Sequence, residues 1–468
     1  MVRKPDKRQR TPDYPIGDYG VRIRMYRQGI GDCFLLRFGG QDDTAKPFTI
    51  LIDCGVHSAT LGGTDLIKEI AGDIRQETGG HLDIVVGTHE HWDHISGFHQ
   101  ARDIFQTMSA DLAWLAWTED NDDALAKKLS LKNKRYRAVH ALSGASNALR
   151  MAGSAAGDRV EALLGFYGPG AGRDLKKAGD ALLALASGKV NYLKPGDVPV
   201  ELPGQMGRVY VLGPPRDEKL IGKSSPSKAK SEVYEFGRFL AAAEQLERGL
   251  DDTDQPFARH HSLPIDATRG MDFFARHYWS VADPDVGDAH PRREDGQAWR
   301  RIGTSWLEMS ESLALHLDHD TNNTSLVLAF ELGPPDEDGP VLIFAADAQV
   351  GNWLGWRHHS WEVGGRPVTG EDLMRRTILY KVGHHASHNA TLEEHGLELM
   401  KDSLELALIP TSEAMASKVD WGNIPWPALL KRLKEVSATK VLRSDKPAGA
   451  DLGAFKLTRD RLFYEISF

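Results

Sequence analysis

Alternation of apolar and polar residues predicts several β-strands near the start of the chain. Residues 21–27 (Val-Arg-Ile-Arg-Met-Tyr-Arg) alternate with a period of two, which is typical of a half-buried strand. Residues 33–38 and 48–52 form two apolar runs separated by a polar loop, and they predict two more strands. Residues 66–74 then place apolar side chains at helical spacing before a Gly-Gly pair, so a helix is expected there. The chain therefore opens as a β-meander followed by a helix.

Further apolar runs continue this pattern to the end of the chain. Strands are expected at 83–87, 112–117, 209–212, 325–330, 341–345, 377–382, 406–409, 440–442, 454–457 and 462–464, with a helix at 427–436. A chain in which strands and helices follow one another in this way is expected to adopt an α/β fold.

Two stretches interrupt the pattern and define the expected domain organisation. The stretch of about 121–190 is rich in Ala and Leu and predicts a helical insertion. The stretch of about 216–300 is charged and carries Ser, Pro and Lys, which predicts a second, partly flexible insertion. Residues 1–20 are expected to form a flexible tail, and residues 21–468 a single domain that carries both insertions.

Composition makes the chain an ordinary globular protein. It has 468 residues, 41% hydrophobic and 26% charged, which is enough apolar mass for a large core. Its two cysteines, Cys33 and Cys54, lie in strand-like runs and are expected to be buried small side chains in a reducing compartment. The basic N-terminus is followed by no apolar segment, and no run approaches the roughly 18 apolar residues that span a bilayer. We therefore expect a cytoplasmic protein with no membrane partner.

Net charge bears on the kind of partner. The formal charge of −9 argues against a protein that coats nucleic acid, although it leaves room for a local basic groove. The cations available for such a groove are Lys127, Lys128, Lys132, Lys134, Arg135 and Arg137, or else Lys223, Lys228 and Lys230. The alternative is that both runs are solvated surfaces, and the sequence leaves the two open.

One short segment carries a dense set of metal-binding side chains. Residues 88–94 (Thr-His-Glu-His-Trp-Asp-His) hold three imidazoles and two carboxylates, directly after the apolar strand 83–87. Imidazole nitrogen and carboxylate oxygen are the ligands that borderline divalent metals prefer. In an extended segment His89, His91 and Asp93 would share a face, and His94 would point elsewhere. That geometry suits two adjacent ions, one held by His89 and His91 and the other by Asp93 and His94.

Two later strands end in groups that suit the same chemistry. The apolar run 341–345 leads into Asp347, whose carboxylate is placed to bridge two cations or, alternatively, to cap the next helix. The apolar run 377–382 leads into Gly-His-His-Ala-Ser-His, beginning at Gly383. Since one short cluster cannot complete two coordination spheres, these strand ends are the expected source of the remaining ligands.

These residues resemble the metallo-β-lactamase superfamily, whose pattern is HxHxDH followed by a distant Asp and a distant His. The likeness is closer to the ComEC-like metallo-hydrolase domain of DNA-uptake channel proteins. The matching pieces are Ile52-Asp53-Cys54-Gly55, His89 to His94, Val211-Leu212-Gly213-Pro214, Asn322-Asn323-Thr324-Ser325, Ala346-Asp347 and His384-His385-Ala386-Ser387. The resemblance covers roughly residues 21–120, 205–215 and 320–465.

The resemblance implies a fold and a metal centre. The fold would be an αββα sandwich with helical and loop insertions, and the metals would lie at one edge between two sheets. Asp347 would bridge the metals, and His384 would complete the second metal with His385 beside it, the choice between these two histidines being open. Ala346 and Ala386 stand where the subgroup commonly has glycine.

The ligand set of the first metal would be the less complete of the two. Many members of the superfamily supply it with a third histidine, and no convincing equivalent is found; His316 and His319 precede the Asn-Asn-Thr-Ser motif, and one of them is placed to approach the site. The centre would then hold one ion tightly and one weakly, or a single ion.

The resemblance also implies an activity. The protein would be a metal-dependent hydrolase that uses a metal-activated hydroxide, with one or two Zn²⁺ ions, or Mn²⁺ or Fe²⁺. Asp93 would bind metal and orient the nucleophile, His385 or Ser387 would donate to the developing oxyanion or leaving group, and Asp53 would orient an imidazole. The expected substrate is a phosphodiester, either nucleic acid or a nucleotide. The alternatives are a lactone, thioester or other acyl substrate, or a non-catalytic metal-binding interaction module.

Overall fold

The computed structural model describes most of the chain and divides it into two units. It describes residues 20–39, 46–129, 131–151, 155–169, 172–223, 305–334, 336–418, 423–437, 440–449 and 455–468, with short pieces at 263, 267–268, 270–277, 421 and 452. The first unit joins Met1–Arg135, Gly165–Lys228 and Leu317–Phe468, and the second joins Tyr136–Leu164 and Ala229–His316. The expected tail, apart from Gly20, and most of the charged stretch 216–300 lie outside the described residues.

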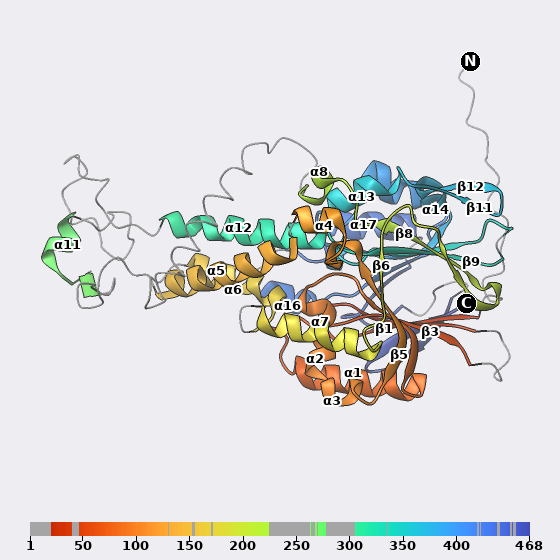
Figure 1. The fold of residues 1–468 in the computed structure, drawn as a ribbon, viewed down its shortest axis with the longest axis horizontal. Helices are drawn as coiled ribbons and strands as arrows, with labels where there is room; N and C mark the ends of the chain where they lie inside the picture. Colours follow the sequence, from red (N-terminus) through yellow and green to blue (C-terminus); the bar gives the residue numbers. More distant parts are fainter. Residues whose placement is uncertain are drawn as a thin grey trace, which may run out of the picture. The chain divides into compact units, whose positions relative to one another are not determined.

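The first unit contains an eight-stranded mixed sheet (Figure 1). Its order is β16-β17-β1-β2-β3-β4-β5-β6. The strands are β1 (Val21–Tyr26), β2 (Cys33–Phe38), β3 (Phe48–Cys54), β4 (His81–Gly87), β5 (Ser109–Ala116), β6 (Val190–Leu193), β16 (Lys456–Arg459) and β17 (Phe463–Ser467). Pairing is antiparallel from β16 to β3 and parallel from β3 to β6, so β3 and β4 end at the same edge of the sheet.

A second mixed sheet of seven strands has the order β15-β14-β13-β10-β9-β8-β7. The strands are β7 (Val200–Leu202), β8 (Gly207–Gly213), β9 (Val327–Leu332), β10 (Val341–Phe344), β13 (Thr377–Lys381), β14 (Leu406–Ile409) and β15 (Val441–Arg443). The strands β10, β13, β14 and β15 run parallel, and β7 to β10 pair antiparallel. A separate hairpin joins β11 (Ser360–Val363) to β12 (Arg366–Thr369).

The two sheets of the first unit pack face to face around a shared apolar core. Phe34 of the first sheet meets Phe344 of the second edge-on, with ring centroids 5.4 Å apart, and Phe38 stacks on Phe330 at 5.8 Å. Side chains from both sheets form this one cluster, which removes their inner faces from water.

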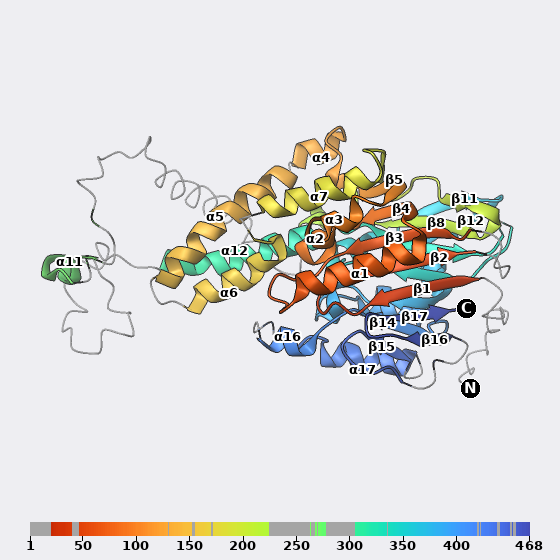
Figure 2. The same ribbon diagram turned by 90° about the horizontal axis from the view of Figure 1, so that it is seen from below.

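Helices cover the outer faces of both sheets (Figure 1), and Figure 2 shows those on the first sheet from below. On the first sheet these are α1 (Gly63–Thr78), α2 (Trp92–Gln100), α3 (Arg102–Phe105) and α7 (Arg173–Leu185). On the second they are α13 (Val350–Trp356), α14 (Gly370–Arg375), α15 (Glu398–Met400) and α17 (Pro427–Val436). The expected α/β architecture is therefore confirmed, and within this unit the layers follow the order helix, sheet, sheet, helix.

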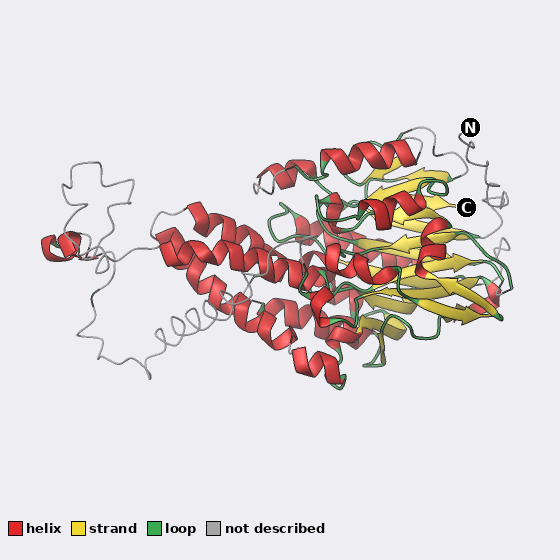
Figure 3. Cartoon of the chain, turned by 90° about the horizontal axis from the view of Figure 1, so that it is seen from above, coloured by secondary structure: helices red, strands yellow, loops and turns green. Residues whose placement is uncertain are grey.

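The remaining helices belong to the connections and to the second unit. Figure 3 draws all described helices in red. The first unit also contains α4 (Ala124–Leu129), α8 (Glu218–Ile221), α16 (Glu413–Lys418) and the short turns η1 (Trp117–Glu119), η2 (Gly165–Tyr167), η3 (Pro203–Gln205), η6 (His384–Ala386) and η7 (Glu393–Leu397). The second unit contains α6 (Ala155–Leu164) and α11 (Asp272–His277), and α5 (Leu131–Met151) and α12 (Ser305–Asn322) have residues in both units. Every helix among the described residues is too short or too polar to span a bilayer.

The apolar runs of the sequence form strands as expected, with shifts of a few residues at their ends. Cys33 and Cys54 are buried and unbonded, also as expected. The interpretation of the first strand as half-buried is wrong, because all of β1 except Arg22 is buried. Arg24 tolerates this position because Asp73 and Glu465 accept hydrogen bonds from its guanidinium at 2.8 and 2.5 Å.

Candidate metal centre

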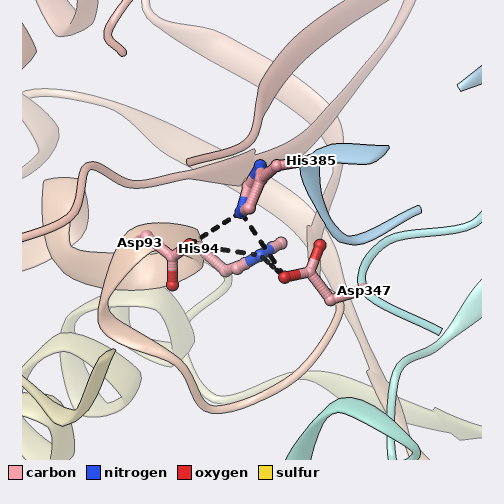
Figure 4. A group of neighbouring side chains, drawn as sticks. All are labelled: Asp93, His94, Asp347 and His385. Atoms are coloured by element: carbon pink, nitrogen blue, oxygen red, sulfur yellow. Dashed lines mark hydrogen bonds and ion pairs between the residues drawn. The ribbon is translucent and has the colours of Figure 1, made fainter. Parts of the chain in front are cut away.

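The candidate site lies where strands of both sheets end. Asp93 and His94 follow β4 in the first sheet, whereas Asp347 follows β10 and His385 follows β13 in the second. Figure 4 shows these four side chains pointing toward one another. The ends of separate strands thus bring together residues that are up to 292 positions apart in the sequence.

The cluster at 88–94 is not an extended segment, and the expectation that His89, His91 and Asp93 alternate along a strand is wrong. Helix α2 begins at Trp92, so that His91 is its N-cap residue and Asp93 and His94 lie in its first turn. An acidic side chain in the first turn interacts favourably with the free backbone amides there. This start of the helix is what turns Asp93 and His94 toward the second sheet.

Two glycines allow the start of α2 to lie against the first sheet. A Cβ atom at Gly55 would lie 2.4 Å from the carbonyl oxygen of Asp93, and one at Gly31 would lie 2.5 Å from the same oxygen. Gly31 also has a φ of +135°, which side chains rarely adopt. The backbone amide of Asp32 donates to this carbonyl at 3.0 Å, which fixes the height of Asp93 above the sheet.

Four buried donors form the first half of the site. The Nε2 atom of His385 lies 3.0 Å from Oδ2 of Asp93 and 3.5 Å from Oδ2 of Asp347. The Nε2 atom of His94 lies 3.2 Å from that same oxygen of Asp347. Two imidazole nitrogens and two carboxylate oxygens at these separations match the ligand set of a Zn²⁺, Mn²⁺ or Fe²⁺ ion.

His89 and His91 form the second half. The Nε2 atom of His89 faces the Nδ1 atom of His91 at 3.0 Å, and both rings are buried. At pH 7 both imidazoles are neutral, since burial lowers the pKa of His89 well below its usual range and that of His91 to about 3. Neutral imidazoles are the form that binds metal. The pair can therefore hold one cation beside the four-donor group.

In three of these four imidazoles, the ring nitrogen that points away from the donor group lies within hydrogen-bond distance of an oxygen atom. The Nδ1 atom of His94 lies 2.7 Å from Oδ2 of Asp53, and that of His385 lies 2.8 Å from the carbonyl oxygen of Pro410. The Nδ1 atom of His89 lies 3.2 Å from the hydroxyl of Thr88, which in turn donates to Asp53. Ligating histidines are commonly oriented in this way. Asp53 therefore occupies the orienting position that was expected of it.

The two carboxylates and their imidazoles compensate one another electrostatically. Burial opposes ionisation, yet His94 and His385 hold the pKa of Asp93 at about 2 and that of Asp347 well below its usual range. In return, and again against the effect of burial, Asp347 and Asp93 raise the pKa of His94 well above its usual range and also raise that of His385. A divalent ion that binds here must displace protons from these imidazoles.

Ion binding at the four-donor group is therefore expected to strengthen as pH rises. Because the pKa of His94 lies above its usual range, the ring is protonated at neutral pH and competes with the ion. Apparent affinity should rise about tenfold per pH unit for each proton displaced, up to the pKa of His94. Calorimetric titration of Zn²⁺ in two buffers of different ionisation enthalpy counts the released protons. Binding with no proton release near pH 7 would contradict this electrostatic assignment.

A buried lysine, which the sequence analysis did not single out, supports the carboxylates. The ammonium group of Lys381, at the end of β13, forms an ion pair with Asp32 and donates to the carbonyl oxygen of Ala346 at 2.7 Å. It also lies 3.7 Å from Oδ1 of Asp347. Lys381 therefore holds the Oδ1 side of Asp347, and the Oδ2 atom faces His94 and His385.

The loop after β13 decides which of its two histidines faces the group. His384, His385 and Ala386 have φ values of 42°, 52° and 65°, and Ala346 across from them has 46°. Such left-handed residues cost about 1–2 kcal/mol each and concentrate at functional sites. Ala346 and Ala386 stand where the subgroup that this chain resembles commonly has glycine, and their φ values are ones that favour glycine.

His385, rather than His384, joins Asp93 and Asp347. The four-donor group thus contains His385, whose Nε2 atom makes the contacts given above, and it does not contain His384. The Nδ1 atom of His384 instead lies 2.7 Å from the hydroxyl of Ser387 and 3.2 Å from the amide nitrogen of Gln349. The left-handed turn rotates successive side chains apart, so that only one of the two rings can face Asp347.

Neither His57 nor His319 belongs to the four-donor group. His57 packs edge-on against Phe166 and Trp421, with ring centroids 4.7 and 4.6 Å away. The Nδ1 atom of His319 lies 2.5 Å from Oε1 of Gln349, and the amide nitrogen of Gln349 in turn contacts His384. The further imidazole beside His89 and His91 is that of His94, whose ring centroid lies 4.2 Å from that of His89. The side chain of His316 lies outside the described residues.

No protein-family model matches the chain, and no curated protein matches its sequence. What the site can do therefore has to be argued from its own residues.

Proposed function

We propose that this protein is a metal-dependent hydrolase of the metallo-β-lactamase superfamily, acting on a phosphodiester. The observation that carries the proposal is the convergence of six buried donors from both sheets: His89, His91, Asp93, His94, Asp347 and His385. Two sheets packed face to face, with helices outside and the donors at one edge between them, agree with an αββα sandwich. A solvated histidine-rich loop would not be buried in this way.

The residues divide the chemical work among them. Divalent ions bound at these donors would supply a hydroxide nucleophile at neutral pH and polarise the bond to be cleaved. Asp93 and Asp347 would hold the ions, and their buried carboxylate oxygens would orient the hydroxide toward the bond to be cleaved. Asp53 and the carbonyl oxygen of Pro410 fix the orientation of the His94 and His385 rings, respectively.

In this proposal His384 forms a hydrogen bond with the substrate. It is only half-buried, unlike His385, and Ser387 and Gln349 hold its ring beside the group. A positioned imidazole next to the reacting atoms suits hydrogen bonding to an oxyanion or proton transfer to a leaving group. The role that was expected of His385 or Ser387 therefore passes to His384, with Ser387 orienting it.

A small phosphodiester such as a nucleotide is favoured over a long nucleic acid. Two adjacent sets of donors suit in-line displacement at phosphorus. Arg135, one of the cations considered for a basic groove, is buried and paired with Glu90 at 2.8 Å and Glu119 at 3.2 Å. Lys128 is paired with Glu218. Cations neutralised in this way add little to the binding of a polyanion.

Metal analysis combined with two substrates tests the proposal. We expect purified protein to carry zinc, manganese or iron and to hydrolyse bis-p-nitrophenyl phosphate, and we expect a chelator to stop the reaction. Turnover of a lactone without turnover of the phosphodiester would move the assignment to acyl hydrolysis. Bound metal with neither activity would indicate a binding module, and protein that binds none of these metals would refute the proposal altogether.

A further inference from the structure

One imidazole of the centre still lacks an orienting oxygen within hydrogen-bond distance. The Nδ1 atom of His91 faces His89, so its Nε2 atom points the other way. The ring of Phe166 stacks on His91 at 5.5 Å and that of Tyr167 meets it edge-on at 4.9 Å. The Nε2 atom is buried and forms no hydrogen bond in the structure. Because buried polar atoms rarely stay unpaired, this atom needs a partner.

Asp318 is the group that faces it. This residue lies near the end of α12, is 4% exposed, and places Oδ1 3.9 Å from Nε2 of His91. Asn322, one turn further along the helix, donates to Oδ2 of Asp318 at 3.0 Å. The Oδ1 atom accepts no hydrogen bond in the structure. An unpaired nitrogen and an unpaired oxygen thus face each other at 3.9 Å.

Asp318 is costly to the fold unless a cation is nearby. Its carboxyl group is buried, its Oδ1 atom accepts no hydrogen bond, and Asp93 and Asp347 are buried as well. Five aspartates are buried here: Asp32, Asp53, Asp93, Asp318 and Asp347. Buried carboxylates need nearby positive charge, which Lys381, the imidazoles and a bound divalent ion would supply. Such a residue contributes to binding rather than to stability.

We propose that Asp318 is a positioning residue of the metal centre, which accepts a hydrogen bond from Nε2 of His91 while Nδ1 of His91 binds an ion. The inference rests on the proposed function, because it presumes that His89 and His91 hold a metal. A carboxylate behind a ligating imidazole raises its basicity and fixes its orientation.

Metal titration of the Asp318→Asn variant tests this role. With Zn²⁺ and a chromogenic competing chelator, we expect the weaker of two ions to lose about 10–100-fold in affinity and the tighter one to be unchanged. The metal-free variant should melt at the same temperature as metal-free wild type or higher, because a neutral amide has replaced a buried carboxyl group that has an unpaired oxygen. A residue with a merely structural role would lower that melting temperature and leave both affinities alone.

Asp320→Asn is the matched control, since it makes the same change two residues along α12 and outside the donor set. Its two Zn²⁺ affinities should equal those of wild type. Equal affinities in Asp318→Asn, or wild-type protein that binds only one ion, would overturn the role of Asp318 and leave the hydrolase proposal standing. Wild-type protein that binds no ion would instead refute the proposed function itself, so the two failures are distinguishable.

Discussion

The Asp347→Asn variant is expected to lose hydrolytic activity by well over 100-fold. Asp347 is the residue that lies within 3.5 Å of both His94 and His385, and its Oδ2 atom is the shared contact. Loss of an outer partner of a metal ligand typically costs about 10–100-fold, and loss of a central ligand should cost more. Turnover of bis-p-nitrophenyl phosphate, measured beside the metal content of the same sample, checks the expectation.

A matched control for that variant is Asp372→Asn, which removes a carboxylate from the capping box at the start of α14. It should cost about 1 kcal/mol of stability and leave turnover and metal content unchanged. If Asp347→Asn retained wild-type turnover at full metal occupancy, Asp347 would not be part of the reacting centre.

Replacing Lys381 with methionine is expected to cost about 3–5 kcal/mol of unfolding free energy. Lys381 and Asp32 are 1% and 2% exposed, so removing the ammonium group leaves the carboxylate of Asp32 buried without its cation and leaves Asp347 less compensated. Urea unfolding in the presence of a chelator measures the loss without a contribution from bound metal.

The control for that measurement is Lys440→Met, at the residue directly before β15 of the same sheet. Lys440 lies 3.8 Å from Glu405, and both side chains are partly exposed. Its replacement should cost no more than about 1 kcal/mol. Similar losses for the two variants would mean that Lys381 acts as an ordinary surface ion pair and does not support the centre.

Strand positions and the donor cluster were predictable from sequence because each has a local cause. A buried strand requires an apolar run, and histidines and aspartates directly after such runs mark the ends of the strands. The segment 88–94, Asp347 and the His384-His385 pair were found in this way. The choice within that pair was not, because it depends on three left-handed residues whose φ values no residue type there encodes.

Lys381 and Asp318 were missed for different physical reasons. Lys381 ends an apolar strand, where a lysine is normally the first residue to reach water, and only the packing of the second sheet on the first buries it against Asp32. Asp318 lies on α12, a helix that the apolar pattern did not predict. Its partner His91 is more than two hundred residues earlier, so no local spacing connects them.

The division of donors between the sheets links metal supply to the integrity of the fold. Asp93 and His94 belong to the first sheet and Asp347 and His385 to the second, and the contact between Asp93 and His385 closes a loop of 292 residues. An ion held by all four would join the two layers at this edge, in addition to their shared apolar core and the Lys381–Asp32 ion pair. Free energy gained on binding such an ion is also free energy that holds the layers together. Loss of the metal would then lower both the activity and the stability of the protein.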